Sequence, residues 1–147
     1  MATNRVLSRE DGNLETSILL SRSRKYIDID LSFEPKPNGD VYKKKDAAAV
    51  KQALKNLILT NYYEKPFNPI YGGNLTAWFF ELAYDETADE IRDAIIDAIE
   101  SYEPRAKIIN VLVDVQPDYH SINVTIEFKV ISTEETAIFA TTVSRLR

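Results

Sequence analysis

A change of hydrophobic period at Glu103-Pro104-Arg105 constrains the fold of this chain more than any other feature. Before it, residues 84–105 place apolar side chains at the spacing of one helical face, with Thr87 and Glu90 in the positions of a capping box. After it, apolar residues recur at every second position, as they do in strands. Because proline disfavours helical geometry in the preceding residue, the helix must end here. The sequence therefore predicts an acidic amphipathic helix that leads directly into a sheet.

The charged residues at this corner have two interpretations. Glu103 and Arg105 are two apart on an extended backbone, so both are expected to project to the same side. Glu100 and Glu103 lie at the negative end of the helix dipole, which costs about 0.3 to 1 kcal/mol each unless a cation compensates. Arg105 is the nearest cation. The residues form either an ordinary surface ion pair, worth about 0 to 1 kcal/mol, or a pair that points outward to a partner.

Three strand-like stretches separated by short turns follow the corner. Residues 108–115 are apolar on nearly both faces, which is typical of a central strand. Residues 121–131 alternate strictly, and residues 136–143 form a last strand. Short connections predict an antiparallel three-strand meander covered on one face by helices, which is an α+β fold.

The first half of the chain is expected to add one strand and to complete a layer of about three helices. Residues 25–33 alternate, with their isoleucines on the side expected to be buried. A helix capped by Asp46 is expected over residues 47–59, and a shorter one after Asn74. The segment 60–73, interrupted by prolines, is expected to fold onto the body. The side chains expected to hold it there are Tyr62, Phe67, Ile70 and Tyr71.

Composition limits the possible classes of function. With 147 residues and 44% hydrophobic content, the chain suffices for a single domain, expected over residues 25–147. The absence of cysteine excludes disulfides, thiolate zinc sites and cysteine nucleophiles. The sequence has no phosphate-binding glycine loop and no metal-ligand cluster, so we expect neither a cofactor nor a metal. It has no run of apolar residues long enough to span a membrane, so we expect no membrane partner.

The net charge of −5 is unevenly distributed along the chain. Residues 1–45 contain nine Lys/Arg and seven Asp/Glu, whereas residues 46–147 contain nine and sixteen, giving +2 and −7. An acidic body repels phosphate backbones, so direct nucleic-acid binding is not expected. Residues 1–24 are polar and rich in Ser and Arg, and we expect an arm that is partly disordered alone and orders on a partner.

The last strand is a second candidate for interaction. It ends the meander and is expected at a sheet edge, with no proline or inward charge to prevent pairing with another strand. The strand that pairs there comes either from the same chain, through residues 25–33 or the arm, or from a partner. The residues of this strand assigned to partner binding are Thr136, Ile138, Phe139, Thr141 and Val143.

Glycoside hydrolysis is the enzymatic alternative, because carboxylates are plentiful. Such an enzyme needs an acid and a base about 5 to 10 Å apart that flank one bond, for example Glu103 with Glu64 or Asp114. Nothing in the sequence spacing fixes such a pair. The only histidine, His120, lies in a predicted turn. No catalytic residue is assigned.

Four segments of the chain occur in a recognisable order. They are IDIDLSF at 27–33, VKQALKNLILT at 50–60, EKPFNPIYGG at 64–73 and YEPR at 102–105, and a strand meander follows them. This order resembles the baseplate wedge and sheath-initiator family of contractile-tailed bacteriophages, to which the TssE component of type VI secretion systems is similar. The family often has Gly-Glu-Arg where this chain has Tyr63-Glu64-Lys65, so no role is transferred to that loop.

The resemblance implies a structural, non-enzymatic role in the virion tail baseplate, which is assembled in the host cytoplasm. Members offer a sheet edge to the first ring of sheath subunits and so initiate the sheath by strand exchange. The implied partners are other baseplate wedge proteins, the tail sheath protein and tube-proximal baseplate proteins. The docking corner of the family falls on Glu103, Pro104 and Arg105. Some members have carried a lysozyme label, so a glycoside hydrolase acting on peptidoglycan is the alternative.

Overall fold

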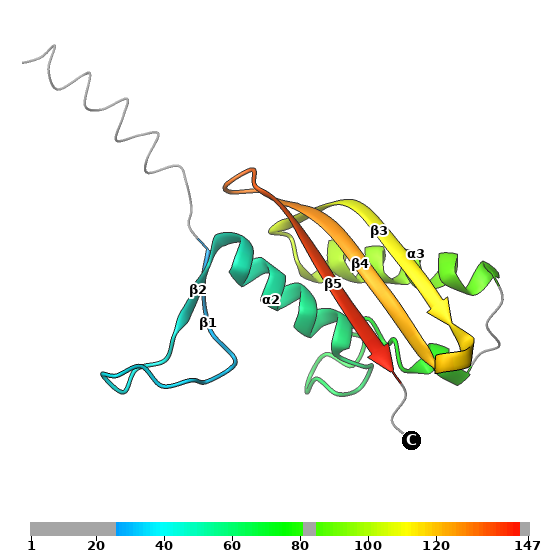
Figure 1. Ribbon diagram of the computed structural model, residues 1–147, viewed down its shortest axis with the longest axis horizontal. Coiled ribbons are helices and arrows are strands. Elements are labelled where there is room, and N and C mark those ends of the chain that lie inside the picture. Colours follow the sequence, from blue (N-terminus) through cyan, green and yellow to red (C-terminus); the bar gives the residue numbers. More distant parts are fainter. Residues whose placement is uncertain (1–25, 81–84, 145–147) are drawn as a thin grey trace, which may run out of the picture.

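The computed structural model describes residues 26–80 and 85–144 of the chain (Figure 1). The expected N-terminal arm, residues 1–24, lies outside the described residues. The elements are, in chain order, β1 (Ile27–Ile29), β2 (Lys43–Lys45), α2 (Asp46–Leu59), a 3₁₀ turn (Ala77–Phe80), α3 (Asp85–Tyr102), β3 (Ala106–Gln116), a second 3₁₀ turn (Pro117–Tyr119), β4 (Ser121–Val130) and β5 (Thr136–Ser144).

The expected antiparallel meander and α+β class are confirmed. Strands β3, β4 and β5 form one sheet in that order, with both neighbouring pairs antiparallel. Helix α3 packs against β3, and helix α2 packs against β5 (Figure 1). Both helices therefore lie on the same side of the sheet, and the core forms between the two layers.

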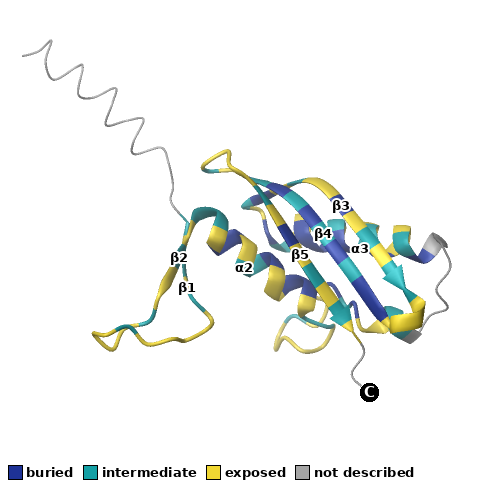
Figure 2. Cartoon of the chain, in the orientation of Figure 1, coloured by how far each residue is buried: buried dark blue, intermediate teal, exposed yellow. Residues whose placement is uncertain are grey.

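The inner face of β4 is the centre of that core. Because the strand alternates, every second side chain of β4 points to the helices. This row of side chains is buried (Figure 2). The helices meet this row with the apolar faces that their 3.6-residue period predicts. The core side chains are Ile122, Val124, Ile126, Phe128 and Val130 from β4, Val50, Leu54, Leu57 and Ile58 from α2, and Ile91, Ile95 and Ile99 from α3.

The prediction that residues 108–115 form the central strand is wrong. Strand β4 is central, and β3 lies at an edge of the sheet. The register of β3 shifts between Ile108 and Asn110, so Ile109 leaves the inner face and is 53% exposed. Leu112 is also exposed on the outer face. The additional apolar residues of this strand thus reflect a bulge and an uncovered outer face rather than burial on both sides.

The expected N-terminal strand does not join the meander. Strand β1 is three residues long and pairs with β2 in a separate two-stranded sheet. The expected facing is also reversed, because Ile27 and Ile29 are 53% and 57% exposed while Asp28 points toward the body. The physical reason is an ion pair between Asp28 and Arg105, described below, which turns the isoleucines outward.

The helical layer is smaller than expected. The described residues contain two α-helices, and the element after Asn74 is only a 3₁₀ turn. Helix α3 begins at Asp85, so Thr87 lies inside its first turn and not at the N-cap position. Asp46 does not cap α2, because its Oδ1 accepts the backbone N–H of Tyr26 at 3.2 Å. None of the described helices has the length and hydropathy required to cross a membrane.

The segment 60–73 is held to the body at its ends rather than at its tip. The Tyr71 ring contacts the ring of Tyr102, with centroids 5.0 Å apart. Gly72 adopts φ of +126°, and a Cβ there would collide with the backbone carbonyl of Thr60, so this close approach requires glycine. Phe67 is fully exposed and Ile70 largely so, which contradicts their expected burial.

Candidate functional site

The Glu-Pro-Arg corner, defined as Glu103, Pro104 and Arg105, closes α3 and opens β3. The N–H of Glu103 donates to the carbonyl of Ile99 at 2.8 Å, and the N–H of Ala106 donates to the carbonyl of Glu103 at 3.2 Å. The backbone therefore leaves the helix and turns within three residues, as the proline requires. Pro104 itself is exposed at the apex.

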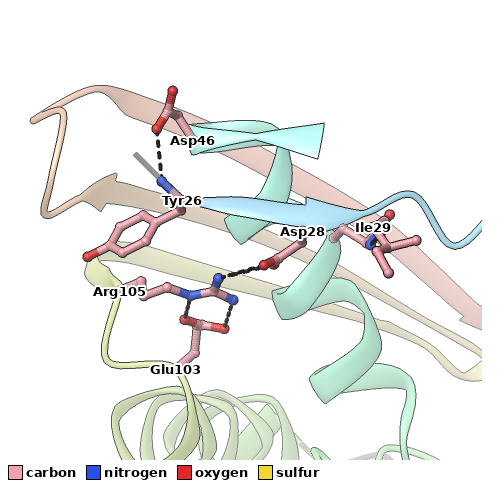
Figure 3. Close-up of polar contacts among 7 residues, drawn as sticks. Tyr26, Asp28, Ile29, Asp46, Glu103 and Arg105 are labelled. Carbon is pink, nitrogen blue, oxygen red and sulfur yellow. Dashed lines mark hydrogen bonds and ion pairs between the residues drawn. The ribbon is translucent and has the colours of Figure 1, made fainter. Parts of the chain in front are cut away.

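The guanidinium of Arg105 binds two carboxylates of its own chain (Figure 3). Its Nε and Nη2 donate to the two oxygens of Glu103 at 2.6 and 2.9 Å, which is a bidentate fork. Its Nη1 donates to Asp28 Oδ2 at 3.0 Å, across 77 positions of sequence. We call these three residues the corner triad. The triad joins β1 to the junction of α3 and β3.

The burial of Glu103 distinguishes the corner triad from an ordinary surface ion pair. Glu103 is only 6% exposed, and its carboxylate is turned toward Arg105. The hydrogen bonds from Arg105 to Glu103, and then to Asp28, raise the pKa of the guanidinium against the opposing effect of its burial. Glu103 and Arg105 lie on the same side of the corner, as predicted, but they do not point outward as a free pair.

Two further contacts hold the β1–β2 hairpin in place. Besides binding Tyr26, Asp46 donates its own N–H to the Tyr26 carbonyl at 2.8 Å. The side-chain amide of Gln52, on α2, donates to the carbonyl of Ile29 at 2.8 Å and accepts the N–H of Leu31 at 3.3 Å. Gln52 thereby occupies backbone groups at the end of β1 and just beyond it that a neighbouring strand would otherwise bind.

A groove of about 550 Å³ lies beside the corner. The hairpin contributes Ile27, Ile29 and Leu31 to its lining, and Arg105 and Tyr71 line it as well. Burial, and secondarily the charge of Glu103, raise the pKa of the Tyr71 hydroxyl, so it stays a neutral donor. The corner thus presents an apolar strip next to ionic groups that are already paired.

Strand β5 is an open edge, as predicted. Within the described residues it pairs only with β4, and β1 pairs with β2 instead. The N–H of Val130 donates to the carbonyl of Glu135 at 2.9 Å, which fixes the alternation of the ladder. By that alternation, Phe139 bonds to β4 through its backbone, whereas Ala140 directs its N–H and C=O to the open side.

The predicted residues of β5 therefore divide into two sets. Thr136 and Ile138 have backbone groups on the open side, and both side chains are exposed. Phe139, Thr141 and Val143 bond to β4 and turn their side chains toward the helices, where Phe139 is buried. Ala140, Thr142 and Ser144 complete the open edge and were missed. Only the register of β4 with β5 identifies them, and that register is not visible in a single sequence.

Two of the carboxylates considered for glycoside hydrolysis, Glu103 and Glu64, are held in hydrogen bonds within the chain. Both oxygens of Glu103 are occupied by Arg105. Glu64 accepts hydrogen bonds from the side-chain and backbone N–H groups of Asn61, at 2.8 Å each, and these bonds lower its pKa. A general acid requires a raised pKa instead. Asp114 lies roughly 26 Å along β3 from the corner end of the strand. His120 is exposed, and no described residues form a metal-binding cluster of acids and histidines.

Comparison with known proteins gives matches of sequence and of fold. The sequence model of the family described as "Baseplate wedge protein gp25" matches residues 44–135. The baseplate wedge protein gp25 of Enterobacteria phage T4 is 33% identical over 106 residues, covering 72% of this chain and 80% of the phage protein. The family match includes the corner and β4 and ends just before β5.

Solved structures share the fold at low sequence identity. A chain of the anti-feeding prophage baseplate has a TM-score of 0.59 and 20% identity, covering 84% of this chain and 88% of that chain. A chain of the type VI secretion baseplate complex has a TM-score of 0.55 and 16% identity, covering 67% and 93%. A Geobacter sulfurreducens protein provisionally named a tail lysozyme has a TM-score of 0.59 and 17% identity, covering 67% and 89%.

Proposed function

This chain belongs to the baseplate wedge protein gp25 family, and from that premise we propose that it initiates the sheath of a contractile tail by strand exchange. In this proposal the protein is a structural component of the tail baseplate and is assembled in the host cytoplasm. Its partners are the tail sheath protein, other baseplate wedge proteins and tube-proximal baseplate proteins. The observation that carries the proposal is the open edge of β5.

An added strand would gain hydrogen bonds and packing at this edge. Thr136, Ile138 and Ala140 direct unpaired backbone groups to the open side, and each bond formed there contributes about 0.5 to 1.5 kcal/mol net. Phe139, Thr141 and Val143 supply the inner surface on which the side chains of the added strand would pack. Backbone pairing gives affinity, and this inner surface gives specificity.

We propose the Glu-Pro-Arg corner as the second docking surface, for other wedge proteins. The polar groups of Glu103 and Arg105 are used within the chain, so the corner triad acts mainly by positioning its surroundings. The surface offered to a partner is then Pro104 with Ile27 and Ile29, which the triad holds exposed. Exposed apolar side chains next to a rigid anchor are typical of an interface.

Replacing Ala140 with proline tests strand exchange. The N–H lost in Ala140→Pro faces the open side, so the variant should keep its bonds to β4 and fold normally. It should join baseplates, yet sheath should fail to polymerise from them, as seen by negative-stain electron microscopy of assembled particles. Ala140→Val, which keeps the N–H at the same exposed position, is the matched control and should give sheaths of normal length. Normal sheaths from the proline variant would refute strand exchange at β5.

The hydrolase alternative predicts a different result in a simple assay. The purified chain should leave the turbidity of a peptidoglycan suspension unchanged, because Glu103 is bound by Arg105 and the pKa of Glu64 is lowered, so neither carboxyl is suited to act as a general acid. A known peptidoglycan glycosidase serves as positive control. Clearing by the wild-type chain that disappears in Glu103→Gln would establish the enzymatic function instead.

A further inference from the structure

A second groove, of about 510 Å³, lies along the proposed strand-exchange edge. Phe139 of β5, the face of α2 that includes Ala48, Lys51 and Lys55, and Leu31 of the hairpin line it. In Figure 1, α2 and β5 run side by side in nearly the same direction, and the two elements are in contact. A strand added to β5 would therefore lie against this face of α2.

The groove is positively charged, although most of the body is acidic. Lys44 is neutralised by Asp30, with Nζ and Oδ1 3.2 Å apart. The N–H of Ser32, and secondarily Lys44, lower the pKa of Asp30, so this carboxylate stays ionised near neutral pH. Lys51 and Lys55 are exposed and form no ion pair with any described residue. Two unpaired ammonium groups thus face the position of an added strand.

We infer that the strand accepted by β5 carries acidic side chains at alternate positions on the side that faces α2. This inference rests on the proposed strand exchange and names the chemistry of its partner. Lys51 and Lys55 are one helical turn apart, about 6 Å along α2. Alternate side chains of a strand are about 6.6 Å apart and point to the same face. Two acids separated by one residue therefore match the two lysines in both spacing and charge.

This charge match acts mainly on selection. Exposed ion pairs contribute little affinity, but complementary charge speeds association and excludes segments of the wrong sign. The exposed acids of α3, among them Asp97 and Glu100, would repel an acidic segment that approached elsewhere. An acidic segment is thus directed to β5, and its binding should weaken as salt is added.

Fluorescence anisotropy with the full-length chain tests the inference. The probes are two labelled peptides of about ten residues, the length of a long strand, which share β-forming residues and carry either Glu or Lys at the alternate positions. In low salt the Glu peptide should bind about tenfold or more tightly than the Lys peptide. Lys55→Glu should weaken binding of the Glu peptide about threefold to tenfold. Lys107→Glu changes the net charge equally on β3 and should have no such effect.

The outcomes distinguish this inference from the proposed function. Equal binding of both peptides, with both lost in Ala140→Pro, would overturn the acidic partner and leave strand exchange intact. If Ala140→Pro still binds the Glu peptide more tightly than the Lys peptide, acidic segments bind in the groove without pairing to β5. That result would argue against strand exchange at β5. An unstructured oligonucleotide of equal charge that competes as well as the Glu peptide would overturn the inference, because the groove would then recognise charge without a strand.

Discussion

Arg105→Ala is expected to lower the free energy of unfolding by about 2 to 4 kcal/mol. The substitution leaves the Glu103 carboxylate, which is 6% exposed, without its cation, and it frees Asp28 and the hairpin. Removing one partner of a fully buried pair costs about 3 to 5 kcal/mol, and the 25% exposure of the Arg105 side chain reduces that figure. Urea denaturation followed by far-ultraviolet circular dichroism measures the loss.

Arg92 supplies a matched control for this substitution. It also contacts two carboxylates, Asp89 at 2.7 Å and Asp93 at 3.2 Å, but all three side chains are well exposed on α3. Arg92→Ala should therefore cost no more than about 1 kcal/mol. Equal losses for the two arginines would show that the corner triad is an ordinary surface pair. Arg105→Lys keeps the charge and loses the fork, and it should fall between the wild type and the alanine variant.

The same variant also tests the second docking surface. If the triad positions Ile27, Ile29 and Pro104 for a wedge partner, Arg105→Ala should enter wedges poorly at a temperature where the isolated chain remains folded. Co-purification with the other wedge proteins measures that defect. If Arg105→Ala is less stable but still enters wedges normally, the corner contributes to folding and is not a docking surface.

Phe128→Ala is expected to have the largest effect on stability, a loss of about 3 to 5 kcal/mol. Phe128 is 0% exposed on the inner face of β4, so truncation leaves a cavity that the two helices and the sheet cannot close. Thermal and urea unfolding of the purified chain give the difference. The loss should appear as a lower urea midpoint with an unchanged slope.

Leu112→Ala on β3 is the control for the position of the central strand. Leu112 is 60% exposed on the outer face of the sheet, and truncating it should change stability by less than about 0.5 kcal/mol. A loss at Leu112 comparable to that at Phe128 would mean that the outer face of the meander is covered and that β3 is buried on both sides.

The spacing of apolar residues correctly predicted the elements that keep the same face buried along their whole length. Strand β4 alternates without interruption between helices and the opposite face, and α3 buries Ile91, Ile95 and Ile99 at helical spacing. The same reasoning failed for β3, because a bulge at Ile109, four residues into the strand, changes the phase of the alternation. A bulge depends on the partner strand, and a period contains no information about the partner.

The hairpin could not be predicted for a related reason. Lys43–Lys45 has poor intrinsic strand propensity and pairs with β1 only because the surrounding contacts favour it. The inward side chain of β1 is Asp28, whose ion-pair partner lies 77 positions away. Alternation identified the two faces of β1 but not which one would be buried, since a distant cation decided it.

The candidate site was predicted in outline. Position in a meander was enough to place β5 at an edge, and the proline was enough to place the corner. Which backbone groups of β5 are open depends on the hydrogen-bond phase with β4, which places the N–H of Ala140 on the open side and that of Phe139 toward β4. The internal pairing of Glu103 and Arg105 depends on burial, which the charges alone do not reveal.

The 77-position separation within the corner triad has a consequence for synthesis on the ribosome. Asp28 is translated early, but its guanidinium partner emerges only after α2 and α3 have left the exit tunnel. Contacts between such distant positions form late, because closing a long loop costs entropy before the contact is made. In a nascent chain the hairpin therefore lacks its ion pair to Arg105 until translation has passed the corner. A stalled or shortened product would expose the isoleucines of β1 without holding them in the position that a partner binds.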